Sequence, residues 1–283
     1  MTSTFRLTLS CPDRPGIVAG ISVALFAYGA NILEAQQFED TETGRFFMRI
    51  VFDCPGNIEP LEAAVGEVER QFGIDLQFHD TTHRKRVLML VSKLDHCLGD
   101  LLYRYRTGEL AMDVVGIVAN HPKNALNLTT IGDIPYHHLP VTRETKPQQE
   151  VQIREIIEAT GAELVVLARY MQILSDEFST YLAGRCVNIH HSFLPGFKGA
   201  KPYHQAHARG VKIIGATAHF VTKDLDEGPI IVQDVEQVSH TDAPSDLVRK
   251  GRDIERRVLA RAVRYLLEDR VMVNDDKTVV FTT

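Results

Sequence analysis

The sequence predicts an α/β protein of two domains. The first is a ferredoxin-like domain of β-α-β-β-α-β order, and the second is built on a doubly wound, mostly parallel sheet. The 283 residues exceed one average domain. Alternating apolar and polar residues, typical of half-buried strands, mark the beginning of the chain, whereas continuous apolar runs, typical of strands buried on both faces, follow later. A short charged linker at 81–86 separates the two patterns, so we place the domains at 1–82 and 83–283.

The elements of the first domain follow from periodicity. Phe5, Leu7 and Leu9 alternate with polar residues, as in a strand with one buried face. Ile58 and Leu61 begin a series of apolar residues that step by three and four, as in an amphipathic helix. The predicted strands cover 5–11, 31–38, 46–52 and 74–78, and the predicted helices cover 17–28 and 58–72. Their order is that of the split βαβ unit.

The apolar stretch at 16–30 has the composition of a signal or membrane segment. It is shorter than the roughly 20 residues that span a bilayer. The residues at 11–15, Cys-Pro-Asp-Arg-Pro, stand where a signal peptide would carry a basic region. We therefore expect a buried helix.

The second domain is predicted from strands that alternate with helices. The run at 87–91 is continuously apolar, as in a strand buried on both faces. Further strands are predicted at 114–119, 164–168, 213–221 and 230–238, helices at 98–105, 149–159, 176–182 and 244–267, and a terminal hairpin with strands at 271–273 and 279–281. This alternation is typical of a parallel, doubly wound sheet.

Charge and cysteine content exclude several classes of protein. The net charge of -6 provides no positive field toward nucleic acid or a membrane surface, so neither partner is expected. None of the four cysteines forms a C-x-x-C pair, which excludes a zinc ribbon and a thioredoxin-like motif. Scattered free thiols are typical of a reducing compartment, so we expect a cytoplasmic protein.

The densest group of reactive side chains lies at 188–195. In an extended strand Asn188 and His190 point to the same side, whereas Ile189 points into the core. An amide and an imidazole can together stabilise an oxyanion, and Asp226, in a later loop, can supply a carboxylate to the imidazole. Residue types alone leave catalysis and ordinary packing both open.

A metal site is an alternative use of the histidines, of which the chain has 12. His190 is followed by His191, and His204 precedes His207 by three positions. However, no H-E-x-x-H motif is present, and adjacent side chains on a strand diverge. We therefore expect no metal.

Two long segments resemble the folate-dependent formyltransferase fold. The segment 186–200 carries Asn-x-His at Asn188 and His190, and the segment 219–233 carries Asp226 shortly before Gly-Pro. The resemblance implies a site for 10-formyltetrahydrofolate in which these three side chains are catalytic. Asn188 and His190 would stabilise the oxyanion, and Asp226, directly or through His190, would manage the proton.

The same resemblance implies the walls of a pterin pocket. The segments 168–174 and 221–226 are similar to the family segments that line it. For Met171 and Leu174, packing in the core is the alternative. The substrate-binding residues implied are Arg169, Tyr170, Met171, Gln172, Ile173, Leu174, Val221, Thr222, Leu225 and Gly228.

The N-terminal part resembles an ACT domain. Asp-Arg-Pro-Gly-Ile-Val at 13–18, followed by Gly-Ala-Asn-Ile at 29–32, is the pattern of that family. A tight turn at a helix start offers free backbone N–H groups to an amino-acid carboxylate. The effector-binding residues expected are Asp13, Arg14, Gly16, Ile17, Asn31 and Ile32. The resemblance implies an effector, glycine or methionine, and a homo-oligomer.

The combination of an ACT domain with a formyltransferase-like domain resembles the formyltetrahydrofolate deformylase family over essentially the whole chain. The segments 92–102, 190–195 and 201–206 are also similar to that family. The implied activity is hydrolysis of a linear amide C–N bond, which releases tetrahydrofolate and formate and regulates the one-carbon pool. Folate would be the substrate, and no metal or nucleotide cofactor is expected.

A formyltransferase acting on a small amine is the alternative function. A phosphorylated acceptor would need a glycine-rich turn at a helix start. The turn at 92–97 has no glycine, and Asp95 is expected to cap the helix, which places a negative charge where a phosphate would bind. An amino-acid sensor with an inactive second domain is disfavoured by the intact catalytic residues. His191, Tyr203 and His204 lie close to the site in sequence, but their roles are not assigned.

Overall fold

The computed structural model describes residues 2–126, 130–196 and 202–282. The chain forms two compact units. Unit 1 contains the described residues up to Arg84, together with Asp269–Met272 and the described residues from Val279 onward. Unit 2 contains the described parts of Lys85–Glu268, together with Val273–Thr278. Each unit has its own sheet and apolar core, so each is described by itself.

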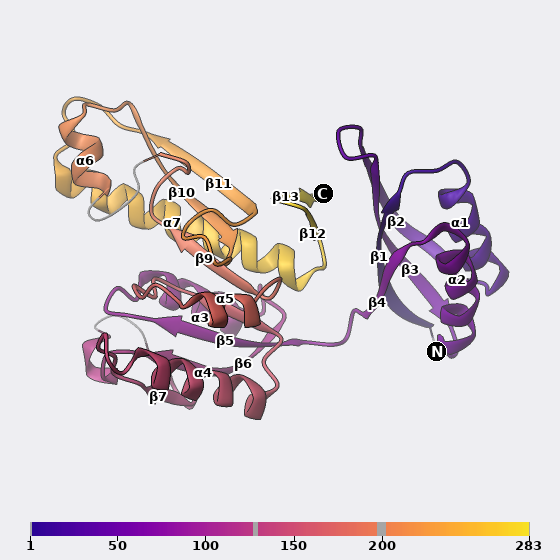
Figure 1. Ribbon diagram of the computed structural model, residues 1–283, viewed down its shortest axis with the longest axis horizontal. Coiled ribbons are helices and arrows are strands. Elements are labelled where there is room, and N and C mark those ends of the chain that lie inside the picture. Colours follow the sequence, from indigo (N-terminus) through magenta and orange to yellow (C-terminus); the bar gives the residue numbers. More distant parts are fainter. Residues whose placement is uncertain (1, 127–129, 197–201, 283) are drawn as a thin grey trace. The chain divides into compact units, whose positions relative to one another are not determined.

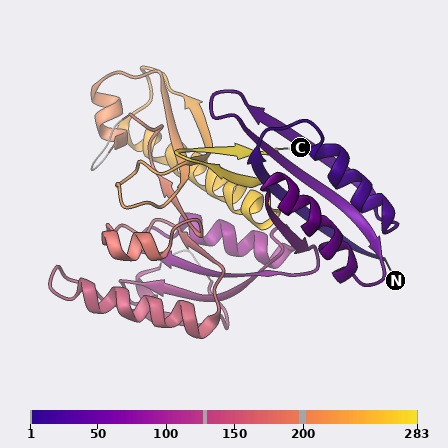
Figure 2. The ribbon, with the colours of Figure 1, turned by 45° about the vertical axis from the view of Figure 1, so that its right-hand side comes forward.

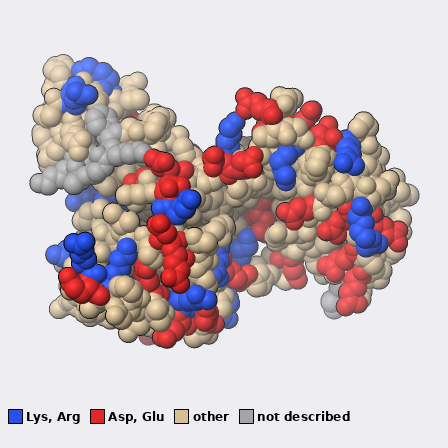
Figure 3. Space-filling model, in the orientation of Figure 1, with Lys and Arg blue, Asp and Glu red and all other residues tan. Residues whose placement is uncertain are grey.

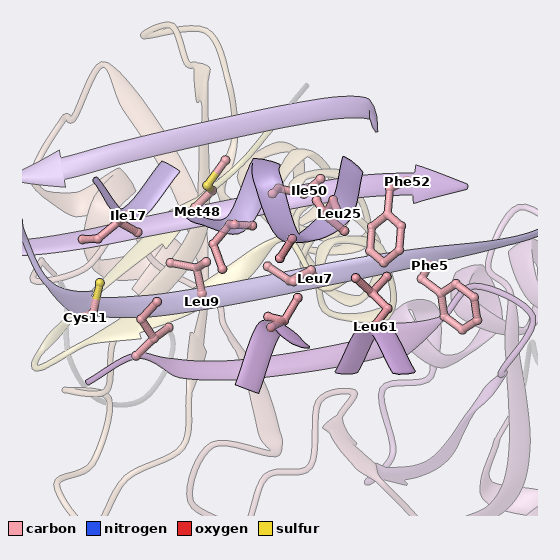
Figure 4. Close-up of a cluster of buried hydrophobic side chains, with 14 of the residues drawn as sticks. Phe5, Leu7, Leu9, Cys11, Ile17, Leu25, Met48, Ile50, Phe52 and Leu61 are labelled. Atoms are coloured by element: carbon pink, nitrogen blue, oxygen red, sulfur yellow. The ribbon is translucent and has the colours of Figure 1, made fainter. Parts of the chain in front are cut away.

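Unit 1 is an antiparallel sheet of order β2-β3-β1-β4 with two helices on one face (Figure 1). Its elements are β1 (Thr2–Pro12), α1 (Ile17–Ala27), β2 (Asn31–Asp40), β3 (Arg45–Pro55), α2 (Glu59–Phe72) and β4 (Asp75–Asp80). Leu7, Leu9, Ile50 and Leu61 are fully buried between the sheet and the helices (Figure 4). The ferredoxin-like prediction is therefore confirmed.

The prediction that the apolar helix at the start of unit 1 is buried is wrong. Only one side of α1 packs on the sheet, through Ile17, Ile21 and Leu25. On the opposite side the side chains of Val23 and Phe26 are 65% and 81% exposed. A helix that covers one face of a sheet buries a single stripe, so the apolar residues outside that stripe remain at the surface.

Unit 2 is a mostly parallel sheet of order β11-β10-β9-β8-β5-β6-β7, in which β9-β10 and β10-β11 are antiparallel. The strands are β5 (Lys85–Val91), β6 (Met112–Ala119), β7 (Tyr136–His138), β8 (Leu164–Leu167), β9 (Cys186–His190), β10 (Ile213–Phe220) and β11 (Ile230–Gln237). All side chains of 87–91 are fully buried, as predicted. The doubly wound prediction is confirmed.

Helices cover both faces of this sheet (Figures 1 and 2), with α3 and α7 on one side and α4 and α5 on the other. The helices are α3 (His96–Thr107), η1 (Lys123–Ala125), α4 (Lys146–Thr160), α5 (Asp176–Tyr181), α6 (Pro202–Ala208) and α7 (Pro244–Leu267). The sequence does not predict β7, η1 or α6, because each is too short to show a periodic pattern.

The surface of the chain carries charges of both signs. Acidic and basic side chains are interspersed over the face shown in Figure 3. Among the described residues, no helix combines the length and the apolar composition needed to cross a membrane.

The end of the chain is divided between the two units. The predicted hairpin forms from β12 (Val271–Asn274) and β13 (Lys277–Val280). In unit 1, the buried Asp269 lies 3.1 Å from Arg6 Nη1 and 3.4 Å from His79 Nδ1. The prediction placed all of 83–283 in the second domain. In the structure, Asp269–Met272 and the described residues from Val279 onward belong instead to unit 1, because charges on β1 and β4 hold this segment there.

Replacing Asp269 by Asn should destabilise unit 1. Asn tolerates the left-handed backbone at this position, where φ is 52°, so the change removes mainly the charge of a buried ion pair. We expect the free energy of unfolding to fall by about 1–3 kcal/mol in urea titrations. Asp275→Asn is the matched control, because Asp275 is also left-handed, with φ 53°, but exposed. Equal losses in the two variants would contradict the assignment.

Candidate active site

The site begins at β9, an inner strand of the sheet in unit 2. Asn188 and His190 alternate with the buried Ile189, as predicted. On one side β9 runs parallel to β8, and on the other it is antiparallel to β10, so that His219 lies directly opposite Asn188. The register of β10 against β11 shifts between Ala218 and His219. Irregularities of this kind often occur next to functional sites, where they change the direction of a side chain.

Asp226 reaches the same place from the loop between β10 and β11. Its carboxylate Oδ1 lies 3.2 Å from His190 Nδ1 and 3.7 Å from His219 Nε2. The loop is tight, because a Cβ atom on Gly228 would overlap the carbonyl oxygen of Phe220. The structure therefore brings together the three catalytic residues predicted from the sequence.

His219 is a buried member of the site that the sequence left unassigned. Its Nδ1 is 2.8 Å from the carbonyl oxygen of Phe220, so Nδ1 carries the proton and donates. Its Nε2 is 3.3 Å from Asn188 Nδ2, which carries two N–H groups. The second N–H of the Asn188 amide remains for a ligand. In the sequence, His219 is a lone histidine in an apolar strand, and such a residue is usually explained by packing.

The charge state of Asp226 follows from its neighbours. Partial burial alone would raise the pKa of this carboxyl, but the contacts with His190 and His219 outweigh it and hold the pKa well below its usual range. Asp226 is therefore ionised at neutral pH. The other ring nitrogen of His190, Nε2, is buried and has no hydrogen-bond partner among the described residues. This nitrogen is available to a substrate.

These side chains line a cavity of about 520 Å³. Nine of the ten residues predicted to bind substrate also line it, and Gly228 does not, because it is pressed against β10. Met171, Ile173 and Leu225 are 53%, 61% and 55% exposed, so core packing does not explain them. They form an apolar wall, which is typical of a small-molecule site. Leu174, by contrast, packs partly against the core of unit 2.

The turn after β5 supports this wall. Ser92 accepts a hydrogen bond from the backbone N–H of Met171 at 3.0 Å, and its own N–H donates to the carbonyl of Arg169 at 3.2 Å. Asp95 occupies the N-cap position of α3, but its side chain makes no capping hydrogen bond, so the predicted cap is only positional. Lys201 and the predicted motif residues at 197–200 lie outside the described residues.

The cavity lining also holds a buried carboxylate, Glu255 on α7, which the sequence did not reveal. It accepts hydrogen bonds from Tyr203 Oη at 2.7 Å and from His96 Nε2 at 2.8 Å, and Arg169 Nε lies 3.3 Å away. Burial would raise the pKa of Glu255, but its contacts with His96, Arg169 and Tyr203 lower it. Its three partners come from three separate segments, so no spacing in the sequence identifies the cluster.

One group of possible metal ligands occurs in the described part of the chain. The ligand atoms of His96, Cys97 and Glu255 lie within 4.8 Å of one another. Burial, with the nearby Glu255, raises the pKa of the Cys97 thiol well above its usual value, so the thiolate that a metal would require is disfavoured. Arg169 also places a positive charge beside Glu255. This group fits internal hydrogen bonding better than a metal ion.

Five of the six residues predicted to bind an effector are exposed in unit 1. They are Asp13, Arg14, Gly16, Asn31 and Ile32. Gly16 has φ 100°, a left-handed conformation that favours glycine, and α1 begins after it without a side-chain cap. Ile17 is the exception, because its side chain belongs to the apolar core of unit 1 and cannot contact an effector.

Comparison with known proteins gives consistent matches. Residues 85–263 match the family described as formyl transferase, and residues 5–73 match the ACT domain. The formyltetrahydrofolate deformylase of Bacillus subtilis is 47% identical, over 98% of this chain and 93% of its own. The crystal structure of formyltetrahydrofolate deformylase from Burkholderia mallei has 53% identity, 99% coverage of both chains and a TM-score of 0.93. Glycinamide ribonucleotide transformylase 1 from Symbiobacterium toebii is 28% identical, with a TM-score of 0.63, and covers 73% of this chain and 98% of its own.

His191, which lines the cavity beside His190, should titrate at unusually low pH. Burial, followed by the positive charge of Arg169, lowers the pKa of His191 to about 4. In NMR titrations its ring should stay neutral down to about pH 4, and Arg169→Gln should move the midpoint upward. The spectrum of His191→Asn would assign the signal. A midpoint near the ordinary value of about 6.5 would contradict the placement of this ring.

The same shift affects stability. Because the folded-state pKa lies below the unfolded value, the unfolded chain takes up the proton first. The free energy of unfolding should therefore fall as the pH decreases from about 6.5 to about 4, and less so in His191→Asn.

Proposed function

The chain belongs to the formyltetrahydrofolate deformylase family, and we propose that it hydrolyses 10-formyltetrahydrofolate to tetrahydrofolate and formate. The observation that carries this proposal is the contact between His190 and Asp226, at 3.2 Å, beside Asn188 in a cavity with an apolar wall. Carboxylate, imidazole and amide are the groups that hydrolysis of a formamide requires.

The mechanism follows from the arrangement of these groups. Water attacks the formyl carbon and gives one proton to Asp226, directly or through His190, while the carbonyl oxygen becomes an oxyanion, which the free N–H of Asn188 and the Nε2–H of His190 stabilise. Asp226 faces the opposite nitrogen of the ring, so it stabilises the imidazolium that forms. The C–N10 bond then breaks, one proton is delivered to N10, and formate leaves. Each such contribution is typically worth about 10²–10⁴-fold in rate.

The apolar wall provides the place for the folate. Met171, Ile173 and Leu225 offer exposed apolar side chains to a pterin ring. This supports the implied role of the segments at 168–174 and 221–226. Folate is the substrate in this proposal, and none of the chemical steps requires a metal or a nucleotide cofactor.

Purified protein should convert 10-formyltetrahydrofolate, supplied with no amine, into equal amounts of tetrahydrofolate and formate. Asp226→Asn keeps a residue that tolerates φ 57° but removes the charge facing His190, so turnover should fall by about 10²–10⁴-fold. Both products are quantified by mass spectrometry, and binding of tetrahydrofolate is measured by calorimetry. We expect the variant to bind the folate normally.

Glu227→Gln is the matched control for this experiment. Glu227 follows Asp226 directly, is exposed and does not line the cavity. Its replacement should leave turnover near that of the unmodified protein. Near-normal turnover in Asp226→Asn would overturn the assignment of the catalytic carboxylate, and no formate from the unmodified protein would overturn the function.

The ACT domain supports a regulatory proposal: unit 1 binds an amino-acid effector, glycine or methionine, at the exposed turn before α1. A hydrolase that discards activated one-carbon units benefits from such control. The exposed apolar side chains of Val23, Phe26 and Leu33 support the further proposal that the chain forms a homo-oligomer through this domain.

Glycine or methionine should therefore change the hydrolysis rate in a saturable way. Arg14 is exposed in the turn, so Arg14→Ala should shift the response to higher amino-acid concentration without changing the basal rate. Arg84→Ala, a substitution outside the turn, is the control. Rates that do not respond to any amino acid would leave the domain with a purely structural role.

A further inference from the structure

Part of the cavity lining is built from side chains that bind one another. Tyr203 on α6, His96 on α3 and Arg169 after β8 all contact Glu255 on α7. All four line the cavity. Tyr203 also lies next to the catalytic group through two ring contacts: its ring centroid is 6.3 Å from that of His191, which is 5.2 Å from that of His190.

The carboxylates in the cavity differ in what they can still bind. Among the described residues that line it, the carboxylates are Asp224, Asp226 and Glu255. Asp224 is exposed in the loop, and Asp226 faces His190 and His219. Glu255 is 1% exposed and uses both oxygens, Oε1 for Tyr203 and Oε2 for His96 and Arg169.

An amine nucleophile needs two things from such a cavity: more space than water occupies, and a carboxylate to bind it. It is protonated in water, so it is attracted by a free carboxylate, which can also take its proton. It then adds to the formyl carbon, the C–N10 bond breaks, N10 receives a proton, and a formamide is released in place of formate. Water needs neither the larger volume nor the additional carboxylate.

We propose that the contact between Tyr203 and Glu255 is the specificity determinant of this site: it closes the cavity to amines, so that water is the nucleophile. This inference rests on the proposed hydrolysis. The ring of Tyr203 fills the space that an amine would need. Its hydroxyl, with His96 and Arg169, occupies Glu255, the buried carboxylate that would bind the amine.

Gly251 on α7 makes room for the contact between Tyr203 and Glu255. A Cβ atom at this position would overlap the ring and the hydroxyl oxygen of Tyr203. The absence of a side chain therefore allows Tyr203 to lie against α7 and to reach Glu255, four residues further along the same helix. A substitution here displaces Tyr203 without altering any group of the network.

The experiment measures how the formyl group is divided between water and an amine. Unmodified protein, Tyr203→Ala and Gly251→Ala are incubated with 10-formyltetrahydrofolate and excess glycinamide. The formylated amine and formate are quantified, and the uncatalysed reaction is subtracted. The unmodified protein should give formate alone, whereas both variants should raise the ratio of formylated amine to formate by about 10-fold or more.

Tyr103→Ala is the matched control, because this tyrosine is exposed on α3, and it should keep the ratio of the unmodified protein. If Tyr203→Ala does not fold, Tyr203→Phe decides, because it keeps the ring and frees only Glu255 Oε1; its ratio should still rise. An unchanged ratio in the folded variants, while the unmodified protein hydrolyses its substrate, would overturn this inference alone. No hydrolysis by the unmodified protein would instead overturn the proposed function.

Discussion

The pairing of β9 with β10 is the constraint on which the rest of the site depends. It places His219 opposite Asn188, and the two side chains contact each other at 3.3 Å. The same strand then leads, through a tight loop, to Asp226, which returns to His190 at 3.2 Å. One antiparallel pair of strands thus assembles the oxyanion donors and the carboxylate. A slip of one residue would turn each side chain to the opposite face of the sheet.

Two of the three carboxylates that line the cavity among the described residues have lowered pKa values but serve different purposes. Contacts with histidines lower the pKa of Asp226, and those with His96, Arg169 and Tyr203 lower the pKa of Glu255. Asp226 faces the ring of His190, whose second nitrogen, Nε2, has no partner among the described residues. The charge of Asp226 therefore acts through this ring on a substrate bound at Nε2. Both oxygens of Glu255 accept hydrogen bonds from protein side chains, Oε1 from Tyr203 and Oε2 from His96. The partners of each carboxylate, not its charge, decide its role.

Most of the fold could be predicted from periodicity, because the long strands and helices of both units bury clear stripes. The alternation of Asn188 with Ile189 also predicted which side chains face the site. Asp226 required the family resemblance, since its backbone conformation, with φ 57°, has no signature in a single sequence. Residues whose role depends on partners that are distant in the sequence could not be predicted from the sequence. Glu255 and His96 meet only when α7 packs beside α3, and nothing in the pattern of either helix indicates this contact.

Phe220 shows how the loop and the catalytic groups are coupled. Its carbonyl oxygen accepts the proton of His219 Nδ1 at 2.8 Å, which fixes the orientation of that ring. Its N–H donates to the carbonyl of Pro229 at 2.9 Å, and Gly228 packs against the same carbonyl group that His219 uses. Closure of the loop and orientation of His219 therefore depend on the backbone of one residue. Gly228 does not line the cavity, but a side chain at this position would overlap the carbonyl oxygen that His219 uses.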